Sequence, residues 1–420
     1  MMTYRSRLAD ALIERALSTF GAVILQGPRA AGKTTSGLRF AASAVRLDAD
    51  PNFLDLASAS PRAVLTGNVP RLVDEWQLVP SLWNVVRHEV DARQVPGQFI
   101  LTGSAVPADD VTRHSGAGRF QRITLRPMTL SESGDSTETV PFAALFEDEE
   151  PAAMGGPEVP EYAEFIVRGG WPALIDRGAD HAHDYLASYL QDLALVDLPQ
   201  MDVRADPVRM AALIRAVARN VATEVSVARL AREAEIRPDD AQPNGLSDKT
   251  VRRYLDALAR VFVLEEQPAW SAHLRSKVRL RTHAKWHFVD PSLAAAALNA
   301  SPQRLLDEPR TLGFLFESLA IRDVRVHAEQ LRGGVYHYRD ETGLETDAIV
   351  ELRDGRWAAF EVKLGGEKPI EDAARSLKQL AEKVSDQRRR DLTSLNVITA
   401  GQASYRRDDG VNVVALGHLA

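Results

Sequence analysis

A phosphate-binding glycine loop at residues 27–34 constrains the fold of this chain more than any other feature. The sequence Gly-Pro-Arg-Ala-Ala-Gly-Lys-Thr matches the pattern G-x-x-x-x-G-K-[ST] in full. An apolar run over 22–25 precedes the loop and predicts a buried strand, and residues 36–45 after it are compatible with a helix. Strand, glycine loop and helix in this order form the context in which the pattern binds a nucleotide. The pattern therefore predicts an α/β domain with a parallel sheet.

The residue types in the loop indicate which ligand it holds. Backbone N–H groups that converge on one concave site bind phosphate oxygens, Lys33 can reach the β- and γ-phosphates, and the Thr34 hydroxyl can ligate Mg²⁺. We therefore expect ATP and Mg²⁺ as ligands. The residues expected to line the nucleotide site are Gly27, Pro28, Arg29, Ala30, Ala31, Gly32, Lys33, Thr34 and Thr35.

Two adjacent carboxylates, Asp74 and Glu75, end a short segment over 71–75. Their distance along the chain from the glycine loop suits the acidic pair that a P-loop ATPase requires. Asp74 is expected to hold Mg²⁺, and Glu75 is expected to orient the attacking water and accept its proton. The alternative is an exposed acidic pair in a turn.

Two further groups are candidates for the same site. A strand predicted over 98–104 ends in Thr102 and Ser104, and either hydroxyl could position water or touch the γ-phosphate, because ligands meet the carboxyl ends of parallel strands. Arg119 precedes another strand predicted over 120–125. It is either an arginine finger supplied across a subunit interface or a surface arginine on a loop.

Composition excludes several classes of protein. A length of 420 residues predicts two to four domains, and the absence of cysteine excludes disulfides, thiolate zinc sites and a cysteine nucleophile. The net charge of −7 means that contact with nucleic acid requires a local basic patch.

No apolar run approaches the roughly 18 residues that span a bilayer, and the first residues do not resemble a signal peptide. We expect a cytoplasmic protein without membrane contact.

The middle of the chain has the pattern of a winged helix. Helices are predicted over 207–221, 226–235 and 247–258, the last with Ser247 as its N-cap, and strands over 262–265 and 277–281. In the second strand four cations alternate with other residues and share one face: Arg275, Lys277, Arg279 and Arg281. This face either contacts the phosphates of DNA or RNA, or protects a solvated sheet edge from pairing.

The last hundred residues contain a second group of chemically active side chains. Glu317 lies in an apolar predicted helix, Asp347 in a predicted strand, and Glu361 and Lys363 in the return strand of a hairpin. Two carboxylates on neighbouring strands can share one divalent metal, with a lysine beside the attacked phosphate and Glu317 as a further ligand. The pattern predicts a metal-dependent phosphodiesterase site, with a surface hairpin as the alternative.

The order of these motifs resembles a large prokaryotic family of AAA-type ATPases with a C-terminal domain of unknown function. The matching segments are 27–34, Asp74-Glu75 with Gln77, 101–104, 118–119, 127–132, 169–172, 250–251, 316–317, 345–347 and 361–363. The resemblance implies binding of ATP and Mg²⁺, a winged-helix middle and a C-terminal core like that of restriction endonucleases, PD-(D/E)xK. The acidic stretch near 134–160 is the main departure from the family pattern.

These observations predict five regions and leave three functions open. The regions are an ATPase domain over 1–135, an acidic linker or insertion over 136–160, a helical region over 161–222, a winged-helix-like region over 223–300 and a nuclease-like domain over 301–420. The first hypothesis is an ATPase that acts on and cuts nucleic acid. The second is a nucleotide-gated regulatory or DNA-binding module whose nuclease-like domain does not cut. The third is an ATPase switch for a protein partner. A homo-oligomer is compatible with each.

Overall fold

The computed structural model describes residues 4–104, 116–147, 149–198, 206–234, 246–271 and 284–420. They belong to two compact units, which we describe separately. The first consists mainly of Met1–Pro127 together with Ala257–Val263. The second contains Met128–Pro199, Arg204–Asp256 and Leu264–Ala420.

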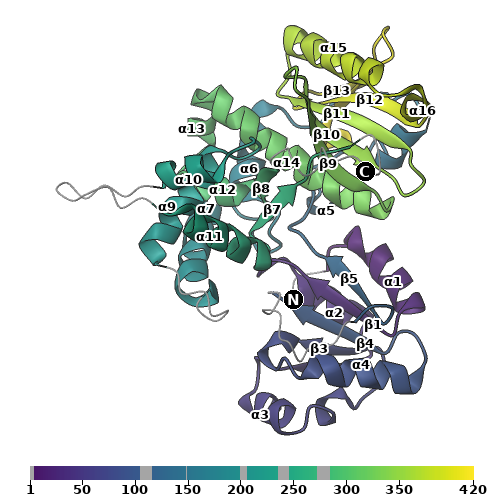
Figure 1. The fold of residues 1–420 in the computed structure, drawn as a ribbon, viewed down its shortest axis with the longest axis vertical. Coiled ribbons are helices and arrows are strands. Elements are labelled where there is room, and N and C mark those ends of the chain that lie inside the picture. The colour runs from purple at the N-terminus through teal and green to yellow at the C-terminus, as the bar shows by residue number, and fades with distance from the viewer. Residues whose placement is uncertain (1–3, 105–115, 148, 199–205, 235–245, 272–283) are drawn as a thin grey trace, which may run out of the picture. The chain divides into compact units, whose positions relative to one another are not determined.

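The first unit is built on a parallel five-stranded sheet with the order β2-β3-β4-β1-β5 (Figure 1). The strands are β1 (Ala22–Gln26), β2 (Ser43–Arg46), β3 (Arg71–Asp74), β4 (Phe99–Gly103) and β5 (Phe120–Thr124). The helices are α1 (Ala9–Thr19), α2 (Lys33–Phe40), α3 (Pro51–Ala59), η1 (Ala63–Leu65), η2 (Trp76–Leu78) and α4 (Leu82–Arg93). The parallel α/β fold predicted for this part of the chain is confirmed.

Helices cover both faces of this sheet because alternate strand residues are apolar on each side. On one face, Ile13 of α1 packs with Leu25, Leu72 and Ile100. The residues of the other face form a cluster with Ala57 of α3 and with Trp83 and Val86 of α4: Ala22, Ile24, Val45, Val73, Phe99 and Leu101. Since the central strands β1, β3 and β4 are buried on both faces, only their ends offer polar side chains a place beside a ligand.

Helices dominate the first half of the second unit. They are α5 (Leu130–Ser133), η3 (Phe142–Phe146), α6 (Val159–Arg168), α7 (Ala179–Asp192), the π-helix η4 (Leu193–Asp197), α9 (Pro207–Arg219), α10 (Val227–Glu233), α12 (Pro291–Ala297), α13 (Pro302–Asp307) and the part of α11 (Asp248–Arg260) that precedes Ala257. Ser247 accepts a hydrogen bond from the Thr250 N–H at 3.2 Å, as expected of an N-cap. β7 (Leu264–Gln267) pairs antiparallel with β8 (Lys285–Phe288). The predicted strand 277–281 and its cations Arg275, Lys277, Arg279 and Arg281 lie outside the described residues.

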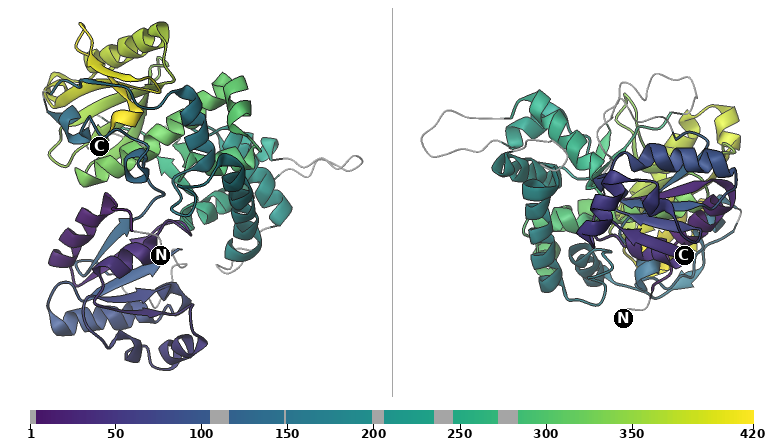
Figure 2. Two further views of the ribbon diagram at one scale, coloured as in Figure 1. Left: turned by 180° about the vertical axis from the view of Figure 1, so that it is seen from behind. Right: turned by 90° about the horizontal axis from the view of Figure 1, so that it is seen from below.

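The C-terminal part forms a mixed seven-stranded sheet with the order β6-β13-β14-β12-β11-β10-β9. Its strands are β6 (Ala153–Met154), β9 (Gly334–Arg339), β10 (Glu345–Glu351), β11 (Trp357–Lys363), β12 (Leu392–Thr399), β13 (Ala403–Arg406) and β14 (Asn412–Ala415). Its helices are α14 (Pro309–Gln330), α15 (Glu367–Lys383), α16 (Asp386–Arg390) and η6 (Leu416–His418). Figures 1 and 2 show residues 309–420 of this part in green to yellow, with α15 along one face of the sheet.

The two faces of this sheet pack against different elements. On one face, Trp357 and Ala359 of β11 join a cluster with Leu377 and Leu380 of α15. On the other, the ring of Phe142 in η3 stacks on Phe360 of β11 and on His327 of α14, with centroid separations of 5.8 and 5.5 Å. The hairpin between β10 and β11 turns at Gly355, whose φ of 93° favours glycine.

The described residues 136–147 and 149–160 include segments that pack onto the C-terminal sheet, which corrects the expectation of a linker or mobile insertion. Val140 forms a bridge to Leu419, and β6 pairs antiparallel with β13. The side chains of Val140, Phe142, Leu145 and Phe146 are buried. The acidic and proline-rich composition suggested a solvated loop, but four spaced apolar residues are sufficient to attach the segment.

A buried ionic group joins two of the segments that carry the family resemblance. Arg322 of α14 contacts Asp290 and Asp323, both at 2.7 Å. Asp290 also accepts from the Gly170 N–H, and Asp323 from the Leu130 N–H, both at 3.0 Å. Segments 127–132 and 169–172 are thus fixed to one helix, and their residues have a structural role within this unit.

None of the helices in the described ranges has the length and apolar character needed to cross a bilayer.

Candidate functional site

The glycine loop connects β1 to α2 and adopts a backbone that only glycine permits at two positions. Gly27 has a φ of 148°, and a Cβ atom there would lie 2.2 Å from the Leu125 carbonyl oxygen. Gly32 has a φ of 93° and directly precedes the first helical residue, Lys33. The Lys33 ammonium donates to the Pro28 carbonyl oxygen of the same loop at 2.6 Å. Burial lowers the pKa of Lys33 to about 8, against the attraction of Glu75 and Asp74.

Asp74 ends β3 beside the loop because parallel strands bring their carboxyl ends to one edge. Its Oδ1 atom accepts from the Thr34 hydroxyl at 2.9 Å and also from the Thr102 hydroxyl. Its Oδ2 atom lies 3.3 Å from Nε of Arg46, the residue opposite Asp74 in β2. Asp74 is 1% exposed, so these contacts hold its carboxylate in one orientation. A carboxylate and a hydroxyl that meet in this way fit a Mg²⁺ ion in their chemistry.

Glu75 follows the strand with a φ of 55°, in the left-handed region. Its carboxylate accepts from the side-chain amide of Gln77 and lies 3.4 Å from the Ser104 hydroxyl. Thr102 and Ser104, which the sequence left as alternatives, therefore have different neighbours. Thr102 contacts Asp74, and Ser104 contacts Glu75.

The structure brings Arg119 to a different place from the glycine loop. It precedes β5, and its carbonyl oxygen accepts from the Ala22 N–H at the start of β1, whereas the glycine loop follows the end of β1. Its Nε atom lies 2.6 Å from Asp91 of α4. Within one chain Arg119 thus lies at the opposite end of the strands from Lys33. Only an Arg119 from a second copy could reach the γ-phosphate.

Arg7 supports the loop, and sequence reasoning missed it. Its guanidinium donates to the carbonyl oxygens of Ala31, in the loop, and of Arg126, after β5, at 3.0 and 2.7 Å. Only 6% of the residue is exposed. No sequence motif distinguishes an arginine before the first helix. Arg7 could have been identified only in the folded chain, by asking which side chain donates to the buried carbonyl oxygens of Ala31 and Arg126.

The predicted C-terminal residues come together from α14, β10 and β11. Ala348 lies opposite Phe360, so alternation puts Asp347 and Glu361 on one face. Lys363 Nζ lies 3.4 Å from Asp347 Oδ2 and 2.7 Å from Glu361 Oε2. The Val362 N–H donates to Asp347 Oδ2 at 2.9 Å.

Lys285 of β8 joins this centre, although its sequence context gave no signal. Its Nζ atom lies 3.0 Å from Glu317 Oε1 and 3.6 Å from Asp347 Oδ1. We call Lys285, Glu317, Asp347, Glu361 and Lys363 the carboxylate–lysine centre. Among the described residues, no group of three or more histidine, aspartate or glutamate side chains has a geometry that could hold a metal ion.

Burial and charge act in opposite directions on the pKa values of this centre. Burial, followed by the charge of Asp347, raises the pKa of Glu317 to about 7 and that of Glu361 to about 8. Burial also disfavours ionised Asp347, but attraction to Lys363 and Lys285 outweighs it and lowers the pKa. Burial alone would lower the pKa values of Lys285 and Lys363. Attraction to the neighbouring carboxylates outweighs burial and raises both pKa values above normal.

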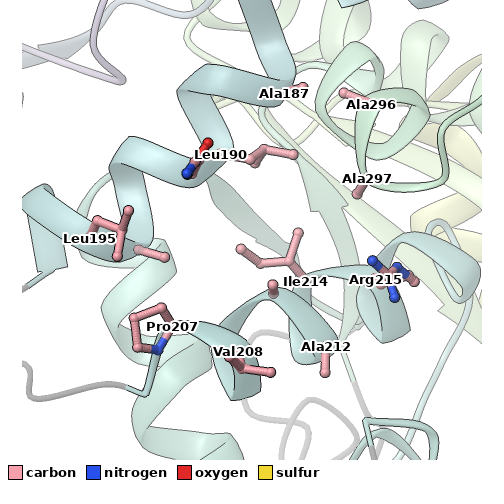
Figure 3. Close-up of a pocket in the computed structure, with 13 residues that line it drawn as sticks. Ala187, Leu190, Leu195, Pro207, Val208, Ala212, Ile214, Arg215, Ala296 and Ala297 are labelled. Carbon is pink, nitrogen blue, oxygen red and sulfur yellow. The ribbon is translucent and has the colours of Figure 1, made fainter. Parts of the chain in front are cut away.

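A cavity of about 600 Å³ lies elsewhere in the second unit, between α7, η4, α9 and α12. Figure 3 shows Leu190, Leu195, Val208 and Ile214 around it, with several alanine side chains. Its few polar neighbours, Gln191 and Arg215 among them, do not form a phosphate site.

Comparisons with known proteins identify the N-terminal part. Residues 19–134 match a family described as "AAA domain". Residues 159–304 and 312–419 match two families, each described as "Domain of unknown function", DUF8612 and DUF4143. Residues 19–134 are thus similar to an AAA domain, in agreement with that part of the predicted resemblance, and the restriction-endonuclease-like core stays a prediction.

Two mycobacterial proteins are similar along most of their length. The uncharacterized proteins Rv2008c of Mycobacterium tuberculosis and Mb2031c of Mycobacterium bovis are each 27% identical over 380 residues, which is 89% of this chain and 77% of theirs. Among solved structures, the Walker-type ATPase PABY2304 of Pyrococcus abyssi matches with a TM-score of 0.40 and 14% identity. That match covers 69% of this chain and 94% of the archaeal chain.

Proposed function

We propose that this AAA-domain protein binds and hydrolyses ATP, and that the nucleotide gates a C-terminal part that is nuclease-like but does not cut. One observation carries the first half of the proposal. Asp74 accepts hydrogen bonds from Thr34 and Thr102 at the edge of the sheet where the glycine loop lies. This arrangement supports a phosphate and Mg²⁺ site, because the ligands are already oriented before nucleotide arrives.

Each side chain has a defined task in this proposal. Lys33 exchanges its contact with the Pro28 carbonyl for the β- and γ-phosphate oxygens. Thr34 and Asp74 would hold Mg²⁺, which supplies positive charge against the phosphate oxygens. The oxygen of the attacking water bonds to the γ-phosphorus, the bond to the ADP oxygen breaks, and Glu75 accepts the proton. Gln77 and Ser104 orient the Glu75 carboxylate.

Phosphate release from ATP tests this proposal directly. We expect Mg²⁺-dependent turnover in the parent protein and a loss of at least about a hundredfold in Lys33→Ala, because the phosphate charge is no longer compensated. Lys383→Ala is the matched control, since that lysine pairs with Asp340 at the surface. Equal turnover in the parent and Lys33→Ala would exclude the site.

The second half of the proposal concerns the partner of the C-terminal part. The carboxylate–lysine centre has the residue types that the family resemblance implies, but two lysines already pair with its three carboxylates. This supports recognition rather than cleavage. DNA or RNA is the partner we propose, on the strength of the four cations at 275–281.

Binding and cleavage assays separate this proposal from its alternatives. Labelled single- and double-stranded DNA and RNA are incubated with the protein in Mg²⁺ or Mn²⁺, with ATP or ADP. We expect affinity that falls with salt and differs between the nucleotides, without cleavage. Cleavage abolished by Asp347→Ala would instead support a nuclease, and the absence of any affinity would support a switch for a protein partner.

A further inference from the structure

We propose that the ammonium of Lys285 takes the position of a divalent metal in the carboxylate–lysine centre, so that the chain completes this centre with its own cation. The inference rests on the proposed nuclease-like, non-cleaving C-terminal part. It does not depend on ATP hydrolysis. It predicts that the parent protein does not bind divalent metal at the centre.

The position of Lys285 Nζ is the first argument. It lies between Glu317 Oε1 and Asp347 Oδ1, at 3.0 and 3.6 Å. A metal bound to both oxygens would lie about 2.1 Å from each and would overlap the ammonium. The other oxygen of Asp347 already accepts from the Val362 N–H and lies 3.4 Å from Lys363 Nζ. Asp347 therefore has an ammonium group within 3.6 Å of each oxygen.

The second argument is that Lys285 is held in place by its backbone and by its neighbours. Lys285 lies opposite Gln267 in the β7–β8 pair. On its other side, its backbone forms an isolated antiparallel β-bridge with the backbone of Glu224. The Gln267 amide donates to the Asp347 carbonyl oxygen at 2.8 Å, which attaches β7 to β10. The Lys285 side chain is 6% exposed. An ammonium fixed in this way is part of the centre and not a mobile surface charge.

The third argument is the charge of the site. Glu317, Asp347 and Glu361 are 8% exposed or less, and three buried carboxylates repel one another unless cations compensate them. Lys363 and Lys285 supply two positive charges inside the centre. A metal in addition would require Lys285 to leave or to lose its proton beside two carboxylates. Repulsion between the Lys285 ammonium and a divalent cation at the same two oxygens therefore disfavours metal in the parent protein.

Mn²⁺ binding to the full-length, nucleotide-free protein tests the inference. Binding is measured by electron paramagnetic resonance, and Tm is measured with and without Mn²⁺, for the parent, Asp347→Asn, Lys285→Ala and Lys285→Ala with Asp347→Asn. Any Mn²⁺ bound near Asp74 is common to all four proteins. Lys383→Ala controls for the loss of a lysine that pairs at the surface.

We expect the parent and Asp347→Asn to bind the same amount of Mn²⁺. We expect Lys285→Ala to have a lower Tm, to gain one Mn²⁺ site and to recover Tm with Mn²⁺, and the gain to vanish when Asp347→Asn is added. Binding by the parent that Asp347→Asn removes would overturn the inference, as would a folded Lys285→Ala without a new site. If Lys285→Ala does not fold, the comparison of the parent with Asp347→Asn still decides between the outcomes. Because ATP turnover is not a readout, failure of the proposed ATPase would leave this test intact.

Discussion

Single side chains at the edge of the parallel sheet are arranged in two hydrogen-bonded groups. Thr34 and Thr102 contact Asp74, whereas Gln77 and Ser104 are near Glu75. The two carboxylates are adjacent in sequence, but the left-handed backbone at Glu75 directs them to different neighbours. This separation is what a metal-holding carboxylate and a proton-accepting carboxylate need, because their tasks differ.

Glu75→Gln should retain ATP and lose hydrolysis. The amide keeps the shape of the side chain but cannot accept a proton, so we expect phosphate release to fall by about 10²–10⁴-fold. Affinity for a fluorescent ATP analogue should change little. Glu89→Gln, on α4 and paired with Arg93, is the matched control. Turnover at the parent rate in Glu75→Gln would show that another group accepts the proton.

At the scale of elements, the short helix η3 and the long helix α14 share one stacked group of rings. Phe142 lies against both His327 of α14 and Phe360 of β11. The segment that carries η3 is acidic, but its side chains Val140, Phe142, Leu145 and Phe146 are buried. Its attachment therefore depends on a few large side chains.

Phe142→Ala should lower the free energy of unfolding of the second unit by about 3 kcal/mol, because a buried ring is replaced by a cavity. Met154→Ala, in the same segment but 81% exposed, should change it by less than about 0.5 kcal/mol. Calorimetric unfolding of the full chain measures both. Similar values for the two variants would mean that Phe142 packing does not hold the segment.

His327 should make the second unit sensitive to acid. Burial lowers its pKa to about 4 from 6.5, against the attraction of Glu132. Between these two pH values the unfolded chain binds a proton that the folded chain does not, so stability is lost as the pH falls. The loss approaches about 3 kcal/mol as an upper bound.

His327→Phe keeps an aromatic ring at this position and removes the proton site. Measured from pH 7 to pH 4, Tm should fall less steeply in the variant than in the parent. His181→Phe, at an exposed position, should leave the slope unchanged. Parallel curves for the parent and His327→Phe would contradict the assigned origin of the acid sensitivity.

At the scale of the whole molecule, the position of Arg119 makes the arginine-finger hypothesis a prediction about oligomeric state. Arg119 lies at the amino-terminal ends of the strands and the glycine loop at their carboxyl ends, so an arginine finger must come from a second copy. If Arg119 acts in this way, Arg119→Ala and Lys33→Ala should each be inactive alone. Mixed together, they should recover roughly a quarter of parent turnover, because some interfaces combine an intact loop with an intact arginine.

Asp91→Ala is the control for this experiment, since it removes the ion-pair partner of Arg119 and leaves the guanidinium in place. A finger predicts that Asp91→Ala stays active. Inactivity of Asp91→Ala equal to that of Arg119→Ala, with no recovery on mixing, would indicate that the pair only stabilises the unit.

Contiguous patterns were sufficient to predict which side chains lie together beside the glycine loop. The glycine loop specifies its own backbone, and a parallel sheet brings Asp74 and Thr102 to the same edge as the loop, so local spacing implied their proximity. In the same way, strand alternation was enough to put Asp347, Glu361 and Lys363 together. The roles assigned to these residues stay predictions.

Only the tertiary structure identified Arg7, the packed segment 136–160 and Lys285. Each depends on contacts between residues far apart in the chain, such as Arg7 with the Arg126 carbonyl group and Lys285 with Asp347. A buried charged side chain is stable only next to a group of opposite charge or a hydrogen-bond partner. When that partner belongs to another helix or strand, the spacing of residues along the sequence does not reveal where it lies. For that reason the sequence pattern of Glu317, Asp347 and Glu361 predicted a bound metal ion. In the folded chain, the ammonium of Lys285 lies beside Glu317 and Asp347.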